Sequence, residues 1–308
     1  MRRRVVLLSV LAVLVVVGAL VVFPRSTAAP HTLASATATV ASTTTPPTAP
    51  ATTTTTRAKS TTTNTTRAGA AATTSTTIAT TTPATRPPSN SGGKVVVIDP
   101  GHNGADGAHT AEINRLVPAG GFMKACDTTG AQTNAGYTEA AFNFDVAQRL
   151  AADLRQRGVT VVMTRTTNDG WGPCINQRAA IGNQARADAA ISIHADGGPP
   201  GGRGFHVIQP ALVRGYTDSI VAPSHRLALD VLAGFPAGTG MPPSTYIGTA
   251  GLDTRAELGG LNLSQVPKVF VECGNMRNAT DAALFSSPTF RQKVADALAA
   301  ALATYLST

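Results

Sequence analysis

The chain has 308 residues, of which 43% are hydrophobic and 14% charged, and its formal net charge is +8. The whole positive excess lies before residue 94, and the rest of the chain has as many basic as acidic side chains. Because nucleic-acid binding needs clustered basic charge on the folded part, this distribution argues against that class, and we expect no nucleic-acid partner.

The first 29 residues have the pattern of an export signal. Arg2, Arg3 and Arg4 precede an uncharged apolar run over residues 5–23, and small residues follow Arg25. The run is longer than an ordinary signal core and approaches the roughly 20 residues that span a bilayer. We therefore predict a signal peptide or a signal anchor over residues 1–29. Both place the rest of the chain outside the cytoplasm and allow membrane contact only through this segment.

Residues 30–93 are rich in threonine, alanine, serine and proline, with almost no large apolar side chain. Such a composition buries too little surface to offset the entropy of ordering the backbone. We predict a disordered stalk that acts as a spacer.

From residue 94 to the end, strand-like and helix-like segments alternate. The predicted strands cover residues 95–99, 159–164, 190–193, 204–209 and 268–271. The predicted helices cover residues 139–157, 175–186, 223–232 and 288–306. Alternation of this kind indicates one α/β domain with a mostly parallel sheet, over residues 94–308.

Polar residues stand near the ends of three of these strands. His102 follows the first, His194 follows the strand at 190–193 and Glu272 ends the strand at 268–271, while Glu139 opens the first helix. Two histidines and one carboxylate are a usual ligand set for hydrolytic zinc, so His102, Glu139 and His194 are candidate ligands. Spacing alone does not decide this, because a single histidine after a strand is more often a hydrogen-bonded structural residue.

Glu272 is the candidate catalytic carboxylate. If its strand lies beside the strand that leads to His102, its side chain reaches the metal site. There it can take a proton from water and pass it to a leaving amine. This is the chemistry of amide hydrolysis.

At these residues the chain resembles the zinc-dependent N-acetylmuramoyl-L-alanine amidases of the type 3 class, especially the short, single-domain ones of mycobacteria. The resemblance runs from about residue 94 to residue 306. It rests on Val97-Ile-Asp-Pro-Gly-His102, Glu139, Val162-Met-Thr-Arg165, Ser192-Ile-His-Ala-Asp196 and Val266-Pro-Lys-Val-Phe-Val-Glu272.

The resemblance implies a mixed, mainly parallel sheet of about six strands flanked by helices. It also implies that His102, Glu139 and His194 hold Zn²⁺, that Glu272 is catalytic, and that peptidoglycan or muropeptides are the substrate. The bond cut would join the muramoyl lactyl group to L-alanine. An alternative of another class is a wall-binding protein that keeps this fold without turnover, and we expect a monomer in either case.

After Glu272 the sequence departs from the family pattern, with Asn275 and Arg277 where a Gly-Phe pair and Ser-Asn are usual. Both residues are candidate substrate contacts. Arg277 is suited to a stem-peptide carboxylate, but an ordinary surface role fits it equally well.

Three cysteines in an exported chain allow one disulfide. Cys126 and Cys174 both lie in loop-like stretches, so we predict that they pair and cross-link the long loop over residues 104–137, which could wall or gate the cleft. Cys273 ends an apolar strand and is expected to be a small buried side chain. A rival enzyme interpretation would make Cys273 a nucleophile, although no histidine is locally paired with it.

Overall fold

The five predicted strands and one further strand form a six-stranded sheet in a computed structural model that describes residues 93–308. The sheet order is β4-β1-β5-β8-β6-β7, in which β4, β1, β5 and β8 are parallel, β6 is antiparallel to β8, and β7 is parallel to β6. The predicted mixed, mainly parallel sheet is confirmed. The strands are β1 (Val95–Pro100), β4 (Thr160–Met163), β5 (Ala189–Asp196), β6 (His206–Pro210), β7 (Leu252–Arg255) and β8 (Lys268–Asn275).

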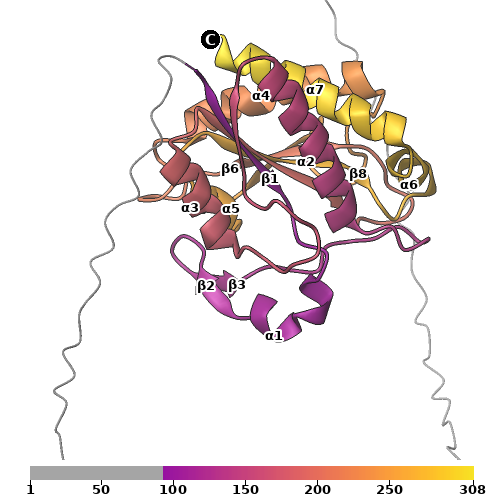
Figure 1. Cartoon of the computed structure of the whole chain (residues 1–308), viewed down its shortest axis with the longest axis horizontal. Coiled ribbons are helices and arrows are strands. Elements are labelled where there is room, and N and C mark those ends of the chain that lie inside the picture. Colours follow the sequence, from indigo (N-terminus) through magenta and orange to yellow (C-terminus); the bar gives the residue numbers. More distant parts are fainter. Residues whose placement is uncertain (1–92) are drawn as a thin grey trace, which may run out of the picture. The chain divides into compact units, whose positions relative to one another are not determined.

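Helices flank this sheet. Three of the four longest follow the predicted helical segments closely, whereas the helix predicted at 223–232 covers Val221–Thr239 and continues through Pro236. The long helices are α2 (Glu139–Gln156), α3 (Ile175–Ala185), α4 (Val221–Thr239) and α7 (Pro288–Leu306), with α5 (Gly259–Asn262) and α6 (Ala279–Phe285) as short ones. A hairpin of β2 (Leu116–Pro118) and β3 (Met123–Ala125) lies with α1 (Thr110–Ile113) at one end of the domain, away from α4 and α7 (Figure 1).

The two faces of the sheet differ in what they bury. Because side chains alternate along a strand, one face carries the large apolar residues that pack on α2, α4 and α7, such as Ile98, Ile191 and Val271. The opposite face, toward α3, has a much smaller apolar cluster around Val97 and Ala190. The first face therefore supplies most of the hydrophobic stabilisation, and the second is left for polar groups.

Asp99 is the centre of a buried charge cluster on the second face. Its carboxylate accepts hydrogen bonds from Thr164 (2.7 Å), Lys268 (2.8 Å), Arg178 (2.9 Å) and Ser192 (3.1 Å). Burial alone would raise the pKa of Asp99, but Lys268 and Arg178 outweigh it and hold that pKa well below its usual range. The cluster joins β1, β8 and the first turns of α3.

Two strands extend well beyond their predicted ends. The strand predicted at 190–193 continues to Asp196, and the one at 268–271 continues to Asn275. His194 and Glu272 thus lie within strands rather than after them. They interrupt the apolar pattern that defined the predicted ends, because they belong to the face that carries polar groups.

Sequence patterns did not predict β7, α5 and α6, or the short elements inside the loop at 104–137. The edge strand β7 is Leu-Asp-Thr-Arg and has a single apolar residue, so it gives no alternating signal. The predicted signal segment at 1–29 and the stalk at 30–93, apart from its last residue, lie outside the described residues. Within residues 93–308, no helix combines the length and the apolar character needed to cross a bilayer.

We predict that Asp99→Ala lowers the free energy of unfolding by about 3–5 kcal/mol, because it leaves buried cations without their shared carboxylate. Chemical denaturation of the variant measures this loss. The matched control is Asp169→Ala at an exposed carboxylate, for which we expect a change within about 0.5 kcal/mol. Equal stabilities of the two variants would contradict the role given to the cluster.

Candidate functional site

The three candidate metal ligands come together although they are distant in the sequence. His102 lies just after β1, Glu139 is the first residue of α2, and His194 lies in β5. The Glu139 Oε1 atom is 3.3 Å from His102 Nε2 and 3.0 Å from His194 Nδ1. One donor atom from each residue lies within 4.8 Å of the others, which is compatible with a shared ion.

The remaining nitrogen of each imidazole is held by the protein. His102 Nδ1 is 2.8 Å from the Thr128 carbonyl oxygen and 3.2 Å from Asp127 Oδ1, and His194 Nε2 is 3.1 Å from Ser192 Oγ. Outer partners of this kind orient a histidine ring and select its tautomer. They leave one nitrogen of each ring directed at Glu139.

The electrostatics of the three residues favour a cation. Burial alone would raise the pKa of Glu139, but His102 and His194 outweigh it and lower that pKa well below its usual value. Burial alone would lower the pKa of His102, but Glu139 and Asp127 raise it well above its usual value. The potential that holds a proton on His102 would equally attract a metal ion, which competes with protons for the same nitrogen.

The backbone next to the site is shaped around the two rings. Any side chain on Gly101 would overlap the ring of His194. The next residue, His102, has a φ of 56°, in the left-handed region that non-glycine residues rarely adopt. Its carbonyl oxygen accepts a hydrogen bond from Arg178 (3.1 Å), which helps hold this conformation.

The sheet order decides which strand lies beside that of Glu272, a point that the sequence left open. Its strand β8 pairs with β5, so Glu272 lies in register beside His194, and β5 separates it from the strand that leads to His102. Its Oε2 atom is buried without a hydrogen-bond partner among the described residues. Burial raises the pKa of Glu272 well above its usual value, and the Glu139 carboxylate adds to this rise.

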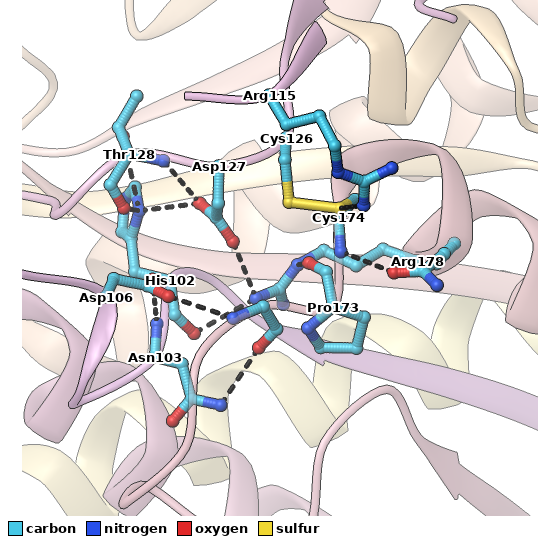
Figure 2. Close-up of a disulfide and its surroundings, with 12 residues drawn as sticks. His102, Asn103, Asp106, Arg115, Cys126, Asp127, Thr128, Pro173, Cys174 and Arg178 are labelled. Carbon is cyan, nitrogen blue, oxygen red and sulfur yellow. Dashed lines mark hydrogen bonds and ion pairs between the residues drawn. A yellow bond between two sulfur atoms is a disulfide. The ribbon is translucent and has the colours of Figure 1, made fainter. Parts of the chain in front are cut away.

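A disulfide joins Cys126 to Cys174, the pair expected from their loop positions, and Figure 2 shows its surroundings. Cys126 directly precedes Asp127, and Cys174 is the residue before α3. From α3, Arg178 donates to Asp127 Oδ2 (3.0 Å). The cross-linked loop therefore holds the residues that orient His102. Its residues Lys124, Ala125, Asp127 and Thr128 also line a cavity beside the ligand cluster, so the suggested role as a wall is compatible with the structure.

The two candidate substrate contacts after Glu272 differ in exposure. Asn275 is fully buried, its Nδ2 donates to the carbonyl oxygens of Pro199 and Gly202 (2.8 Å each), and its Oδ1 accepts from the Arg277 backbone N–H. Its polar atoms are occupied by backbone, which corrects the expectation that Asn275 contacts substrate. Arg277 has an exposed side chain.

Cys273 is unsuited to nucleophilic catalysis. Its side chain is fully buried in the apolar cluster under α2, α4 and α7, on the face of the sheet opposite His194. Burial raises the pKa of its thiol well above the ordinary value, and the nearby Glu272 contributes. The expected structural role of Cys273 agrees with this position.

A cavity of about 160 Å³ adjoins the ligand cluster. It is lined by the rings of His102 and His194 and by the apolar side chains of Ile175, Leu258 and Phe270. The Phe270 ring stacks on His194, with centroids 5.2 Å apart and planes at 3°. The site thus has an apolar surface directly beside its polar donors, as ligand sites commonly do.

Sequence reasoning missed Asp127 and Thr128 as partners of His102. Asp127 stands in a loop far from any strand or helix pattern, and its carboxylate reaches the site only because the loop folds back. The one sequence feature that could have indicated Asp127 is its position next to Cys126, because a disulfide also restrains the residue beside the cross-linked cysteine.

Comparison with known proteins assigns the family. Residues 96–304 match the N-acetylmuramoyl-L-alanine amidase family, and the chain belongs to it. It is 43% identical over 215 residues to the N-acetylmuramoyl-L-alanine amidase Rv3717 of Mycobacterium tuberculosis, covering 70% of this chain and 87% of that protein.

Solved structures agree with this assignment. The N-acetylmuramyl-L-alanine amidase Ami1 of Mycobacterium smegmatis is 45% identical, with a TM-score of 0.66 and coverage of 70% of this chain and 97% of that one. Ami1 of Mycobacterium abscessus is 44% identical, with the same TM-score and coverage of 70% and 99%.

We predict that Gly101→Ala displaces the His194 ring, because the added methyl group and the ring would occupy the same space. A crystal structure of the variant should show His194 Nδ1 separated from Glu139. The control is Gly107→Ala in the following loop, where the nearest atom to the new Cβ would be 3.9 Å away and no displacement is expected. An unmoved His194 ring in Gly101→Ala would contradict the steric argument.

Proposed function

We propose that the chain is a zinc-dependent N-acetylmuramoyl-L-alanine amidase, which hydrolyses the amide between the muramoyl lactyl group and L-alanine of the peptidoglycan stem. The observation that carries the proposal is the Glu139 carboxylate lying between His102 Nε2 and His194 Nδ1 in a member of this amidase family. The bond that is cut is inferred from the names of the relatives, and the hydrolytic mechanism is inferred from the arrangement of the site residues.

The donor set fits zinc. His102, Glu139 and His194 offer two nitrogens and one oxygen, which is the usual set of three protein ligands at hydrolytic zinc. The outer contacts of both rings fit the same role. When bound, zinc lowers the pKa of water and polarises a carbonyl group.

Glu272 is the proposed general base. It lies in register beside His194, and burial raises the pKa of its carboxyl group, which makes the carboxylate a stronger base. It takes a proton from the attacking water and delivers it to the nitrogen of the departing L-alanine. Burial keeps Oε2 away from bulk water.

Arg277 is the proposed substrate contact. It follows the end of β8, five residues after Glu272, and its exposed guanidinium is available to a ligand. A planar guanidinium binds carboxylates in a bidentate manner, and the stem peptide carries free carboxylates. We assign Arg277 to recognition of the stem rather than to the chemical step.

The proposed place of action is outside the cytoplasm, in the periplasm or cell wall. The leader at 1–29 supports export, the stalk at 30–93 would separate the catalytic domain at 94–308 from the membrane, and the Cys126–Cys174 disulfide fits an oxidising compartment. Peptidoglycan or its fragments are the substrate there.

We predict that Glu272→Gln abolishes release of L-Ala-D-isoGln from muramyl dipeptide, with a loss of at least about 100-fold. Mass spectrometry of the products and metal analysis of the protein check this, and zinc content should stay near that of the wild type. Glu257→Gln, at an exposed glutamate, is the control and should retain activity. A wild-type protein that neither holds zinc nor cleaves would be better described as a wall-binding protein.

We predict that Asp127→Asn lowers zinc affinity about 10- to 100-fold, because the variant loses the carboxylate that contacts His102 Nδ1. Removing the cross-link with Cys126→Ser and Cys174→Ser should act in the same direction, since it frees the loop that carries Asp127. Competition with a chromogenic chelator measures the affinity, and Asp169→Asn serves as the surface control. Unchanged affinity in Asp127→Asn would refute the orienting role.

A further inference from the structure

A second histidine stands beside the proposed catalytic carboxylate. His206 begins β6, which pairs antiparallel with β8, and it is directly opposite Glu272 in the register. On its other side Glu272 is in register with His194 of β5. Residues directly opposite each other project from the same face of a sheet with Cβ atoms about 5 Å apart, so the three side chains form one row across β5, β8 and β6.

His206 and Glu272 each have an unused polar atom. The His206 side chain is 1% exposed, and its Nδ1 is buried without a hydrogen-bond partner among the described residues, as is Glu272 Oε2. Buried polar side-chain atoms are paired in the large majority of cases, so an unpaired one requires an explanation. Here a nitrogen able to donate and an oxygen able to accept belong to two directly opposed residues.

The surroundings of His206 keep its ring neutral and in place. Burial lowers its pKa, and this outweighs the opposing effect of the Asp196 and Asp253 carboxylates. A neutral imidazole has one N–H to donate. The Tyr246 ring packs edge-on against it, with centroids 6.3 Å apart, and the Tyr246 hydroxyl is fixed by donating to Asp196 (2.9 Å).

We propose that His206 is a positioning residue, which donates its Nδ1–H to one buried water that in turn donates to Glu272 Oε2, and so fixes the direction of the catalytic carboxylate. This rests on the function proposed above for Glu272. With Oε2 held by His206, Oε1 is left to exchange a proton with water and with the leaving amine. A displacement of about 1 Å at a catalytic group can lower the rate about 100-fold, so a contact that fixes the Glu272 carboxylate would affect the rate by a similar factor.

Kinetics of the full-length protein separate positioning from simple packing. His206→Leu keeps an apolar side chain but removes the donor, and we expect kcat for muramyl dipeptide to fall about 100-fold, with KM and zinc content unchanged. His206→Gln restores an amide donor and should recover kcat to within about tenfold of wild type. The control is His225→Leu, at an exposed histidine that contacts Gln209, and it should leave kcat unchanged. A wild-type kcat in His206→Leu would overturn the proposal.

A second measurement is independent of turnover. In protein labelled with ¹⁵N-histidine, the ring-nitrogen signals of His206, assigned by their loss in His206→Gln, should shift in Glu272→Gln and stay fixed in Glu257→Gln. If the His206 ring-nitrogen signals do not shift in Glu272→Gln, the contact is refuted, even if His206→Leu fails to fold. If the wild type cleaves nothing while the His206 signals still respond to Glu272, the proposed function fails and the contact stands.

Discussion

The buried carboxylate of Asp99 is the constraint on which the site depends. Its ion pairs with Lys268 and Arg178 tie β1 to β8 and to α3, and Arg178 extends the same network to Asp127, which contacts His102. Breaking a buried pair leaves an uncompensated charge, so the network tolerates few alternative arrangements. A chain of charged contacts thus runs from the middle of the sheet to His102, the proposed metal ligand. The position of His102 therefore depends on the ion pairs that neutralise the buried charges.

The sheet assigns stability and chemistry to opposite faces. Along β5, Ile191 and Ile193 face the large apolar cluster, while Ser192 and His194 face the site. Along β8, Val271 and Cys273 alternate with Glu272 in the same manner. Because a one-residue shift of register would exchange the two faces, the apolar core fixes which polar residues meet. This also explains how the free Cys273 can be adjacent in sequence to the proposed catalytic carboxylate of Glu272 and yet lie on the opposite face of the sheet.

Local patterns at strand ends and helix starts predicted the fold class. They made His102, Glu139 and His194 only candidates, and the expectation that these three residues share a metal rested also on the resemblance to a known family. The sequence left open which strand lies beside that of Glu272, since strand order is a long-range property that no local pattern encodes. Asn275 shows a different limit. A side-chain amide can hydrogen-bond either a ligand or the backbone of a turn. Only the folded structure shows that the Asn275 amide donates to the carbonyl oxygens of Pro199 and Gly202. Asp127 was missed because its contact with His102 depends on the path of a loop.

The disulfide acts on the same short segment as the buried charges. Cys126 tethers the chain covalently to the start of α3, and the next residue, Asp127, is tethered to α3 a second time through Arg178. The following residue, Thr128, offers its carbonyl oxygen to His102. A loop of more than thirty residues would otherwise sample many conformations at this point, and the entropy of that sampling opposes metal binding. Two tethers at adjacent residues remove most of this freedom before an ion arrives, so the proposed metal site is organised by the protein itself rather than by the metal.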